Sequence, residues 1–99
     1  MAAVKIGNKV VSNDSPTYMI AEIGINHGGS LEVAKAMVSA AHLAGCEIVK
    51  HQTHFVDDEM TDEAKTIFPP NADKSIWHVM QECALGKDEE IALKKHAES

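Results

Sequence analysis

The chain has 99 residues, a formal net charge of -6 and apolar residues at 44% of its positions, a composition typical of one small globular domain. With nine Lys and Arg against 15 Asp and Glu, it has no basic stripe, which argues against a nucleic-acid backbone or an anionic membrane as its main partner. No apolar run approaches the roughly 20 residues that span a bilayer, no signal peptide is recognisable, and the two cysteines lack metal-ligand spacing. We therefore expect a cytoplasmic protein with reduced thiols.

A short β-hairpin is predicted at the N-terminus. Residues 4–12 alternate between apolar and polar side chains around the turn-forming pair Gly7-Asn8. A polar stretch that ends at Pro16 breaks this pattern. We expect residues 1–17 to form the hairpin and residues 18–99 to form the main fold.

A strand, a helix and a second strand are predicted next. The apolar run of residues 18–23 does not alternate, which is typical of a strand buried on both faces of a parallel sheet. Ser30 is a suitable N-cap for an amphipathic helix, and Gly45 is expected to end that helix in the left-handed conformation. The second strand covers roughly residues 47–52.

The remaining residues are predicted to form a long loop and two helices. The polar segment 57–65 reads as a solvated, functional or mobile loop, closed by Pro69-Pro70-Asn71. Residues 75–85 predict a short helix that ends at Gly86, and a further helix begins at Asp88. The inward side chains of the first of these helices are expected to be Ile76, Val79, Met80 and Cys83, with Trp77 also in the core.

Two strands with their helices do not close a core. A parallel sheet needs further strands to cover its edges, and a complete (β/α)8 barrel needs about 250 residues. We therefore expect an α/β fold that is either the N-terminal piece of a larger enzyme or completed by an assembly partner.

Glu22 and Lys50 are the strongest candidates for chemistry. In a right-handed strand–helix–strand unit both strands point the same way, so the charges near their carboxyl ends lie on one rim, where parallel α/β folds place active sites. Glu22 interrupts an apolar strand, where an ionised carboxylate is costly unless paired, and this favours a role as general acid or base or in orienting a hydroxyl-rich ligand. Lys50 suits phosphate, carboxylate or Schiff-base chemistry, although the residues alone slightly favour a solvated lysine at a strand end.

Four other polar residues are weaker candidates. Gln52 is expected on the same face as Lys50, with an amide for a sugar hydroxyl, or as a plain polar strand end. Asn26 and His27 precede two glycines and either approach an anion or form a flexible turn. Asn71 follows two stiff prolines and is either presented to a ligand or a turn residue.

The histidines after the second strand are expected to have a supporting role. His51 and His54 lie three apart outside a helix, and no carboxylate is placed to complete a metal site with them. We interpret His51 as a structural or supporting residue rather than a ligand.

Several blocks resemble one known family. Glu-Ile-Gly-Ile-Asn-His at 22–27, Lys-His-Gln-Thr-His at 50–54, Asp-Glu-Met at 58–60 and Asn-Ala-Asp at 71–73 closely resemble the start of the bacterial sialic acid (N-acetylneuraminate) synthases. The resemblance covers nearly the whole chain in order and spacing.

The resemblance implies a TIM barrel followed by a small antifreeze-like domain that caps the partner's barrel in a swapped homodimer. The family condenses phosphoenolpyruvate with N-acetylmannosamine, using Mn²⁺ or another divalent ion such as Mg²⁺, and releases phosphate by C–O cleavage. Carried over by position, Lys50 would bind phosphoenolpyruvate, while Glu22, Gln52 and Asn71 would contact the amino sugar. The metal-binding histidines and the capping domain are expected beyond Ser99, so the segment alone is expected to be inactive.

Two alternatives remain open. Legionaminate and pseudaminate synthases look similar around the first block, but typically lack the Lys-His-Gln-Thr-His sequence. A non-catalytic module would instead self-associate or bind a partner through its unpaired sheet edge.

Overall fold

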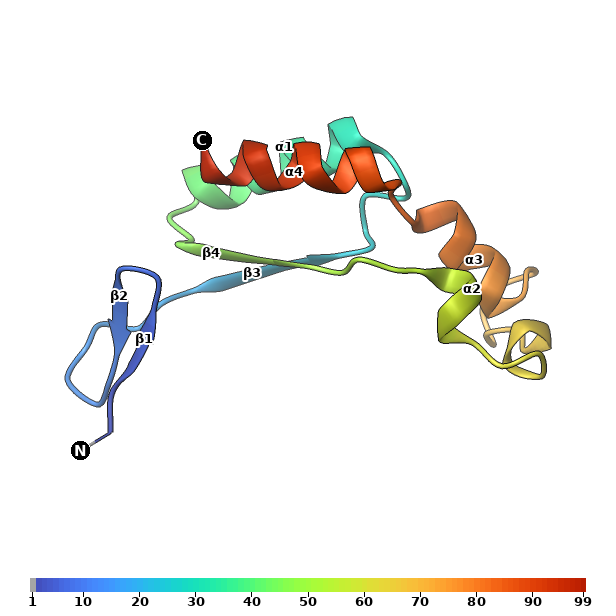
Figure 1. The fold of residues 1–99 in the computed structure, drawn as a ribbon, viewed down its shortest axis with the longest axis horizontal. Helices are drawn as coiled ribbons and strands as arrows, with labels where there is room; N and C mark the ends of the chain where they lie inside the picture. Colours follow the sequence, from blue (N-terminus) through green and yellow to red (C-terminus); the bar gives the residue numbers. More distant parts are fainter. Residues whose placement is uncertain (1) are drawn as a thin grey trace.

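An antiparallel hairpin begins the computed structural model, which describes residues 2–99. Strand β1 (Val4–Ile6) pairs with β2 (Lys9–Val11), and Gly7 between them has a φ of 59°, which suits glycine in a tight turn. In Figure 1 the hairpin stands apart from the helices, and Val4, Ile6 and Val10 are all exposed.

A parallel strand–helix–strand unit forms the centre of the molecule. Strand β3 (Ile20–Gly24) pairs with β4 (Ile48–His51), and helix α1 (Leu31–Leu43) connects them. The Ser30 hydroxyl accepts a hydrogen bond from the Val33 N–H at 3.2 Å, and Gly45 after the helix has a φ of 93°. Both predicted ends of this helix are therefore confirmed.

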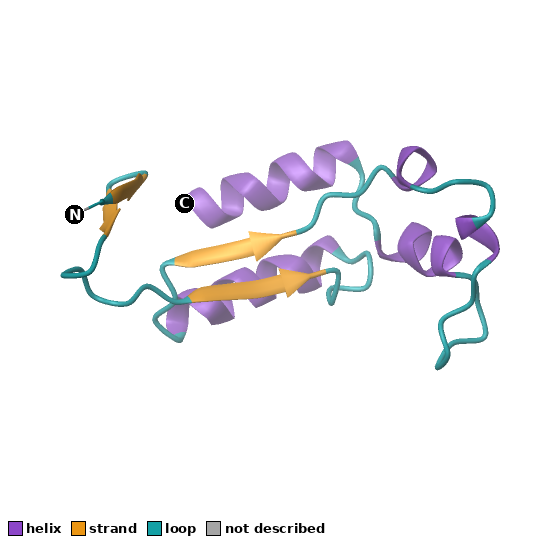
Figure 2. Cartoon of the chain, turned by 90° about the horizontal axis from the view of Figure 1, so that it is seen from below, coloured by secondary structure: helices purple, strands orange, loops and turns teal. Residues whose placement is uncertain are grey.

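The sheet is covered on one face. Helices α1 and α4 (Lys87–Glu98) lie side by side over it, as Figures 1 and 2 both show. The core between them consists of Ile23, Ala34, Val38, Leu85 and Leu93. No helix in the described residues 2–99 is long and apolar enough to cross a membrane.

The prediction that β3 is buried on both faces is wrong for this chain. Ile20 is 57% exposed, whereas Ile23 is buried against the helices. Side chains alternate between the two faces of a strand, and within residues 2–99 only the helical face has a covering layer. Apolar composition alone does not reveal how many layers surround a strand.

A group of short helices lies beyond the carboxyl ends of the strands (Figures 1 and 2). It contains α2 (Val56–Glu59), a 3₁₀ turn (Ala64–Thr66) and α3 (Ile76–Cys83). The segment expected to be a solvated, functional or mobile loop is thus partly helical, and Asp57 accepts a hydrogen bond at 3.3 Å from the indole N–H of Trp77 on α3. Part of the acidic run therefore has a structural partner.

Helix α3 differs from its prediction in length and packing. It ends at Cys83, because Ala84 is extended with a ψ of 138°, and Gly86 precedes α4 rather than ending α3. None of its residues is fully buried. Val79, Met80 and Cys83 are half-buried on the expected inward side, as is Trp77, whereas Ile76 is exposed. The reason is that α3 packs on the 3₁₀ turn and α2 instead of the sheet.

The loop between β3 and α1 presses against the end of α3. Gly29 has a φ of 85°, and a Cβ atom there would overlap the carbonyl oxygen of Glu82. Gly28 has a similar φ of 64° but has open space around it. The two adjacent glycines therefore share a backbone requirement and differ in their contacts.

Gly29→Ala is expected to lower the free energy of unfolding more than Gly28→Ala. Both substitutions place alanine in the left-handed region, at a cost of about 1–2 kcal/mol. Only Gly29→Ala adds a backbone clash, worth about 1–3 kcal/mol more if overpacked cores are a guide. Chemical denaturation of the two variants measures the difference, and equal losses would show that the loop does not touch α3.

Candidate functional site

Glu22 and Lys50 are brought together across the two parallel strands. They are partners in the β3–β4 register, and the Lys50 Nζ lies 3.8 Å from the Glu22 Oε1. Their strand neighbours Ile23 and Val49 pack in or against the core, so alternation places the charged pair on the uncovered face of the sheet.

The pair is open to solvent, whereas Glu22 was expected to lie in a buried strand. The side chains are 56% and 62% exposed, so Glu22 is not the buried carboxylate that the apolar run suggested. An exposed ion pair of this length contributes about 0–1 kcal/mol to stability. Both groups can therefore turn to a ligand at little cost to the fold.

Two amide side chains meet at the carboxyl end of β3. Gly24 has a φ of 52°, and the Nδ2 of Asn26 and the Nε2 of Gln52 each lie 3.7 Å from the position that a Cβ of Gly24 would take. Asn26 also donates to the Ile23 carbonyl at 3.0 Å. The absence of a side chain at Gly24 lets both amides gather two residues beyond the Glu22–Lys50 pair, where they can donate hydrogen bonds to hydroxyl or carbonyl groups.

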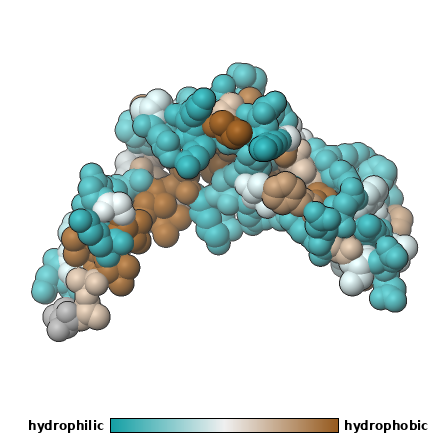
Figure 3. Space-filling model, in the orientation of Figure 1, coloured by the Kyte–Doolittle hydropathy of each residue, from teal (hydrophilic) through white to brown (hydrophobic). Residues whose placement is uncertain are grey.

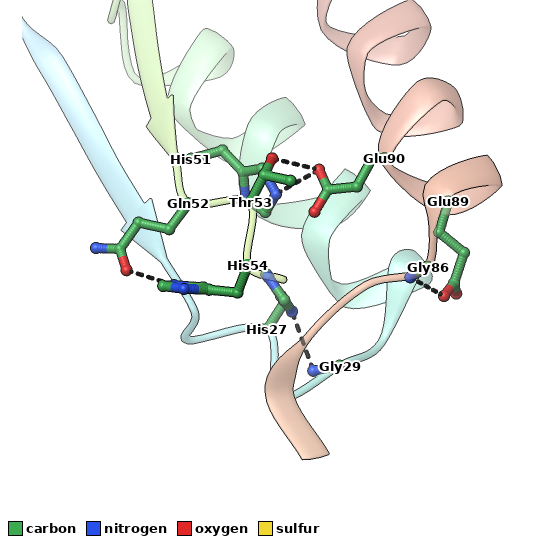
Figure 4. A network of polar contacts seen from close by, with 9 residues as sticks. All are labelled: His27, Gly29, His51, Gln52, Thr53, His54, Gly86, Glu89 and Glu90. Atoms are coloured by element: carbon green, nitrogen blue, oxygen red, sulfur yellow. Dashed lines mark hydrogen bonds and ion pairs between the residues drawn. The ribbon is translucent and has the colours of Figure 1, made fainter. Parts of the chain in front are cut away.

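A histidine and carboxylate cluster lies behind this rim, on the helical side of the sheet (Figure 4). The His51 Nε2 is 2.8 Å from the Glu90 Oε2, and the Thr53 hydroxyl donates to the same oxygen at 3.1 Å. The His27 ring stacks on His51 at a tilted angle, with 5.4 Å between ring centroids. We call His27, His51, Thr53 and Glu90 the Glu90 cluster.

His27 is held as a neutral ring. It is 3% exposed, and its Nδ1 accepts the Gly29 N–H at 3.0 Å, which places the proton of the neutral ring on Nε2. Burial lowers the pKa of His27, the neighbouring His51 lowers it further, and Glu90 opposes the shift. A group of this kind orients its neighbours rather than carrying charge.

Asn71 is not brought to the other predicted residues. It lies exposed in a turn after Pro70, where the Ala72 N–H donates to the Pro69 carbonyl at 3.2 Å. Within the described residues 2–99 it makes no hydrogen bond or ion pair with the rim. Its assignment to a ligand site stays a prediction.

Sequence reasoning missed Glu90, Thr53 and Glu59. Glu59 accepts from His54 Nδ1 at 2.8 Å and from the Phe55 N–H at 2.9 Å. Glu90 is one of three acidic residues in the first turn of α4, where the helix dipole favours negative charge, so its position alone does not mark it as part of a site. The available signal was the polar run at 51–54 beyond a strand end, which needs partners once it leaves the sheet.

An open α/β unit with charged and amide groups at the carboxyl ends of its parallel strands defines part of an α/β protein of the kind that binds small molecules at that rim. Residues 37–99 match the NeuB family, and the chain belongs to this family.

The relatives come from several branches of the family. The chain is 42% identical over 76 residues to the spore coat polysaccharide biosynthesis protein SpsE of Bacillus subtilis strain 168, covering 77% of this chain and 20% of that protein. It is 36% identical over 67 residues to human N-acetylneuraminate-9-phosphate synthase, covering 68% of this chain and 18% of the relative. The chain thus spans about a fifth of the length of these relatives.

Two solved structures share the architecture. The crystal structure of B. subtilis SpsE superposes with a TM-score of 0.67 at 34% identity, over 98% of this chain and 25% of that one. The N-acetylneuraminic acid (sialic acid) synthetase of Leptospira borgpetersenii serovar Hardjo-bovis, in complex with citrate, gives a TM-score of 0.79 at 25% identity, over 98% and 30%. The described residues are therefore a mixed α/β segment of a NeuB-family structure, in which the barrel is not closed.

Enzymes of this family use a divalent metal ion. Within the described residues 2–99, no group of three His, Cys, Asp or Glu side chains is arranged to hold one. The side chains near the rim that could ligate a metal contact one another instead, as in the His51–Glu90 and His54–Glu59 pairs. These residues do not fit a metal centre.

Proposed function

We propose that the protein carrying this chain condenses phosphoenolpyruvate with N-acetylmannosamine to give N-acetylneuraminate and phosphate. The chain would supply the first βα units of a TIM barrel and part of both substrate sites. The observation that carries the proposal is the Glu22–Lys50 pair, in register on the uncovered face of a parallel sheet. Membership of the NeuB family and relatives named as N-acetylneuraminate-9-phosphate synthases support it.

Lys50 is assigned to the anionic substrate. Its side chain is 62% exposed and its ion-pair partner Glu22 lies 3.8 Å away, so three N–H donors can reach a phosphate or carboxylate. Glu22 beside it prevents the rim from being uniformly positive.

The sugar is assigned to the carboxylate and the amides. Glu22 would accept hydrogen bonds from sugar hydroxyls and act as acid or base, while Gln52 offers donor and acceptor groups two residues beyond Lys50. Asn71 would approach from the turn between the 3₁₀ helix and α3. Asn26, His27 and His51 would support the rim without touching substrate.

Other parts of the proposed enzyme would come from outside this segment. A divalent ion, Mn²⁺ or Mg²⁺, would be bound by residues that this segment does not contain. A homodimer in which an antifreeze-like domain caps the partner's barrel, and a cytoplasmic location, belong to the same proposal.

A second candidate is a synthase for a diamino sugar acid. The chain is 41% identical over 51 residues to N,N'-diacetyllegionaminic acid synthase of Legionella pneumophila and 37% identical over 65 residues to pseudaminic acid synthases of Campylobacter jejuni. These values are similar to those for the sialic acid branch, so identity does not separate the two sugars.

A side-by-side assay of the protein with N-acetylmannosamine and its 2,4-diamino analogues tests both candidates. With phosphoenolpyruvate and Mn²⁺ present, we expect kcat/KM for N-acetylmannosamine to exceed that for the analogues by about tenfold or more, because a site built for one polar substituent rejects its absence or replacement. Phosphate release and mass spectrometry of the product give the rates. The reverse preference would establish the second candidate, and no phosphate release with any sugar would refute both.

A further inference from the structure

The Glu90 cluster connects helix α4 to the segment that leaves β4. The Glu90 Oε2 accepts hydrogen bonds from His51 and Thr53, the residues on either side of Gln52 (Figure 4). We propose that Glu90 is a positioning residue that fixes Gln52 for the amino sugar. This inference rests on the proposed function, in which Gln52 contacts that sugar.

Gln52 needs an external support because the ladder stops before it. Strand β4 ends at His51, so strand pairing no longer fixes the backbone from residue 52 onward. One carboxylate oxygen holds the side chains immediately before and after Gln52, at 2.8 Å and 3.1 Å. These contacts tie down the chain on both sides of Gln52, and its Oε1 lies 3.0 Å from the His54 Nε2.

Glu90 itself is firmly placed. It lies in the first turns of α4, where its N–H donates to the Gly86 carbonyl at 2.9 Å, and the same helix is anchored in the core by Leu93. Its side chain is 16% exposed and that of His51 is 17% exposed. Hydrogen bonds to a shielded carboxylate are stronger than those between neutral groups, so Glu90 is a stiff support.

The opposite side of the His51 ring is also occupied. His27 packs against it and is itself fixed by the Gly29 N–H. The imidazole is therefore held between the β3–α1 loop and α4. Positioning of Gln52 thus depends on a residue of α4 that lies 39 positions from His51 in the sequence.

The experiment measures the KM of each substrate in the complete protein for Glu90→Ala, Thr53→Val and the double variant. Glu90→Ala is expected to raise the KM for the amino sugar about tenfold, and Thr53→Val about threefold, because hydrogen bonds to charged groups are the stronger ones. The KM for phosphoenolpyruvate is expected to stay within about twofold, since Lys50 lies inside the strand ladder. The double variant should be no worse than Glu90→Ala, because both changes remove the same contact.

Glu98→Ala is the matched control. Glu98 is exposed on the same helix, and its ion pair with Lys94 is long, at 3.9 Å, so the substitution should change neither KM.

Gln52→Ala reports on the proposed function itself. If Gln52→Ala raises the sugar KM while Glu90→Ala and Thr53→Val leave it unchanged, the positioning role is wrong and the proposed function stands. If Gln52→Ala has no effect, the sugar contact and the inference are both wrong. Should Glu90→Ala fail to fold, Thr53→Val decides alone, and an unchanged sugar KM in it overturns the inference.

Discussion

Lys50→Ala is expected to raise the KM for phosphoenolpyruvate by about tenfold or more. The substitution removes a charge-assisted contact to the anionic substrate, and loss of such a contact costs about 1.5–3 kcal/mol. Steady-state kinetics with the amino sugar at saturation measure the change. The size of the effect rests on the assignment of this ammonium group to the phosphate or the carboxylate.

The stability of the fold should not change when Lys50 is replaced by alanine. Its side chain is 62% exposed and its ion pair with Glu22 is long at 3.8 Å, so the contribution to stability is small. The melting temperature of Lys50→Ala should therefore match that of the parent. A change in KM without a change in melting separates a binding role from a structural one.

Lys94→Ala is the control for Lys50→Ala. Lys94 is 78% exposed on α4 and pairs only weakly with Glu98, at 3.9 Å. Its removal takes away the same charge without touching the rim, so the KM for phosphoenolpyruvate should stay constant. If Lys50→Ala behaved in the same way, Lys50 would be an ordinary solvated lysine at a strand end.

The parts of the fold that were predictable from sequence are those fixed by local chemistry. Ser30 and Gly45 mark the ends of α1 because a cap hydroxyl and a left-handed glycine act on adjacent backbone. Gly86 was expected to end α3 and instead precedes α4. A glycine between two helices serves as the end of one or the start of the other, and the extended backbone of Ala84 decides which.

Burial and tertiary contacts were harder to predict from the sequence. The pairing of Glu22 with Lys50 followed from the direction of parallel strands, but their exposure depends on how many layers cover the sheet. Glu90 could not be assigned to the rim, because its contact with His51 joins residues 39 apart and depends on how α4 docks. Side-chain periodicity gives the face of a helix and not its neighbour.

The isolated 99-residue chain is expected to self-associate or to be partly unfolded, and to form no sialic acid. Its radius of gyration is 16.6 Å, whereas a compact domain of this length has about 13 Å. Its accessible surface is 7117 Å², against about 5,500 Å² for a folded monomer of its mass. The described structure thus leaves uncovered a large area that a stable monomer would bury.

The uncovered surface is apolar and includes free backbone groups. Figure 3 shows hydrophobic surface running from the hairpin to the adjoining sheet, where Val10, Met19 and Ile20 are among the exposed side chains. The described sheet has only β3 and β4, so each strand has one unpaired edge, and open edges recruit other strands. In the isolated chain, contacts between copies would cover both the apolar surface and the unpaired strand edges.

Light scattering and thermal melting of residues 1–99 measure the association, and an assay with Mn²⁺, phosphoenolpyruvate and N-acetylmannosamine measures the activity. Ile20→Lys is the informative variant, because it places a charge on the uncovered face at a side chain that is 57% exposed and outside the core. It should reduce the oligomer without restoring activity, since a charged strand face resists pairing with apolar surface. A monodisperse, cooperatively melting monomer that forms product would overturn both the argument from uncovered surface and the expectation that the metal ligands lie outside this segment.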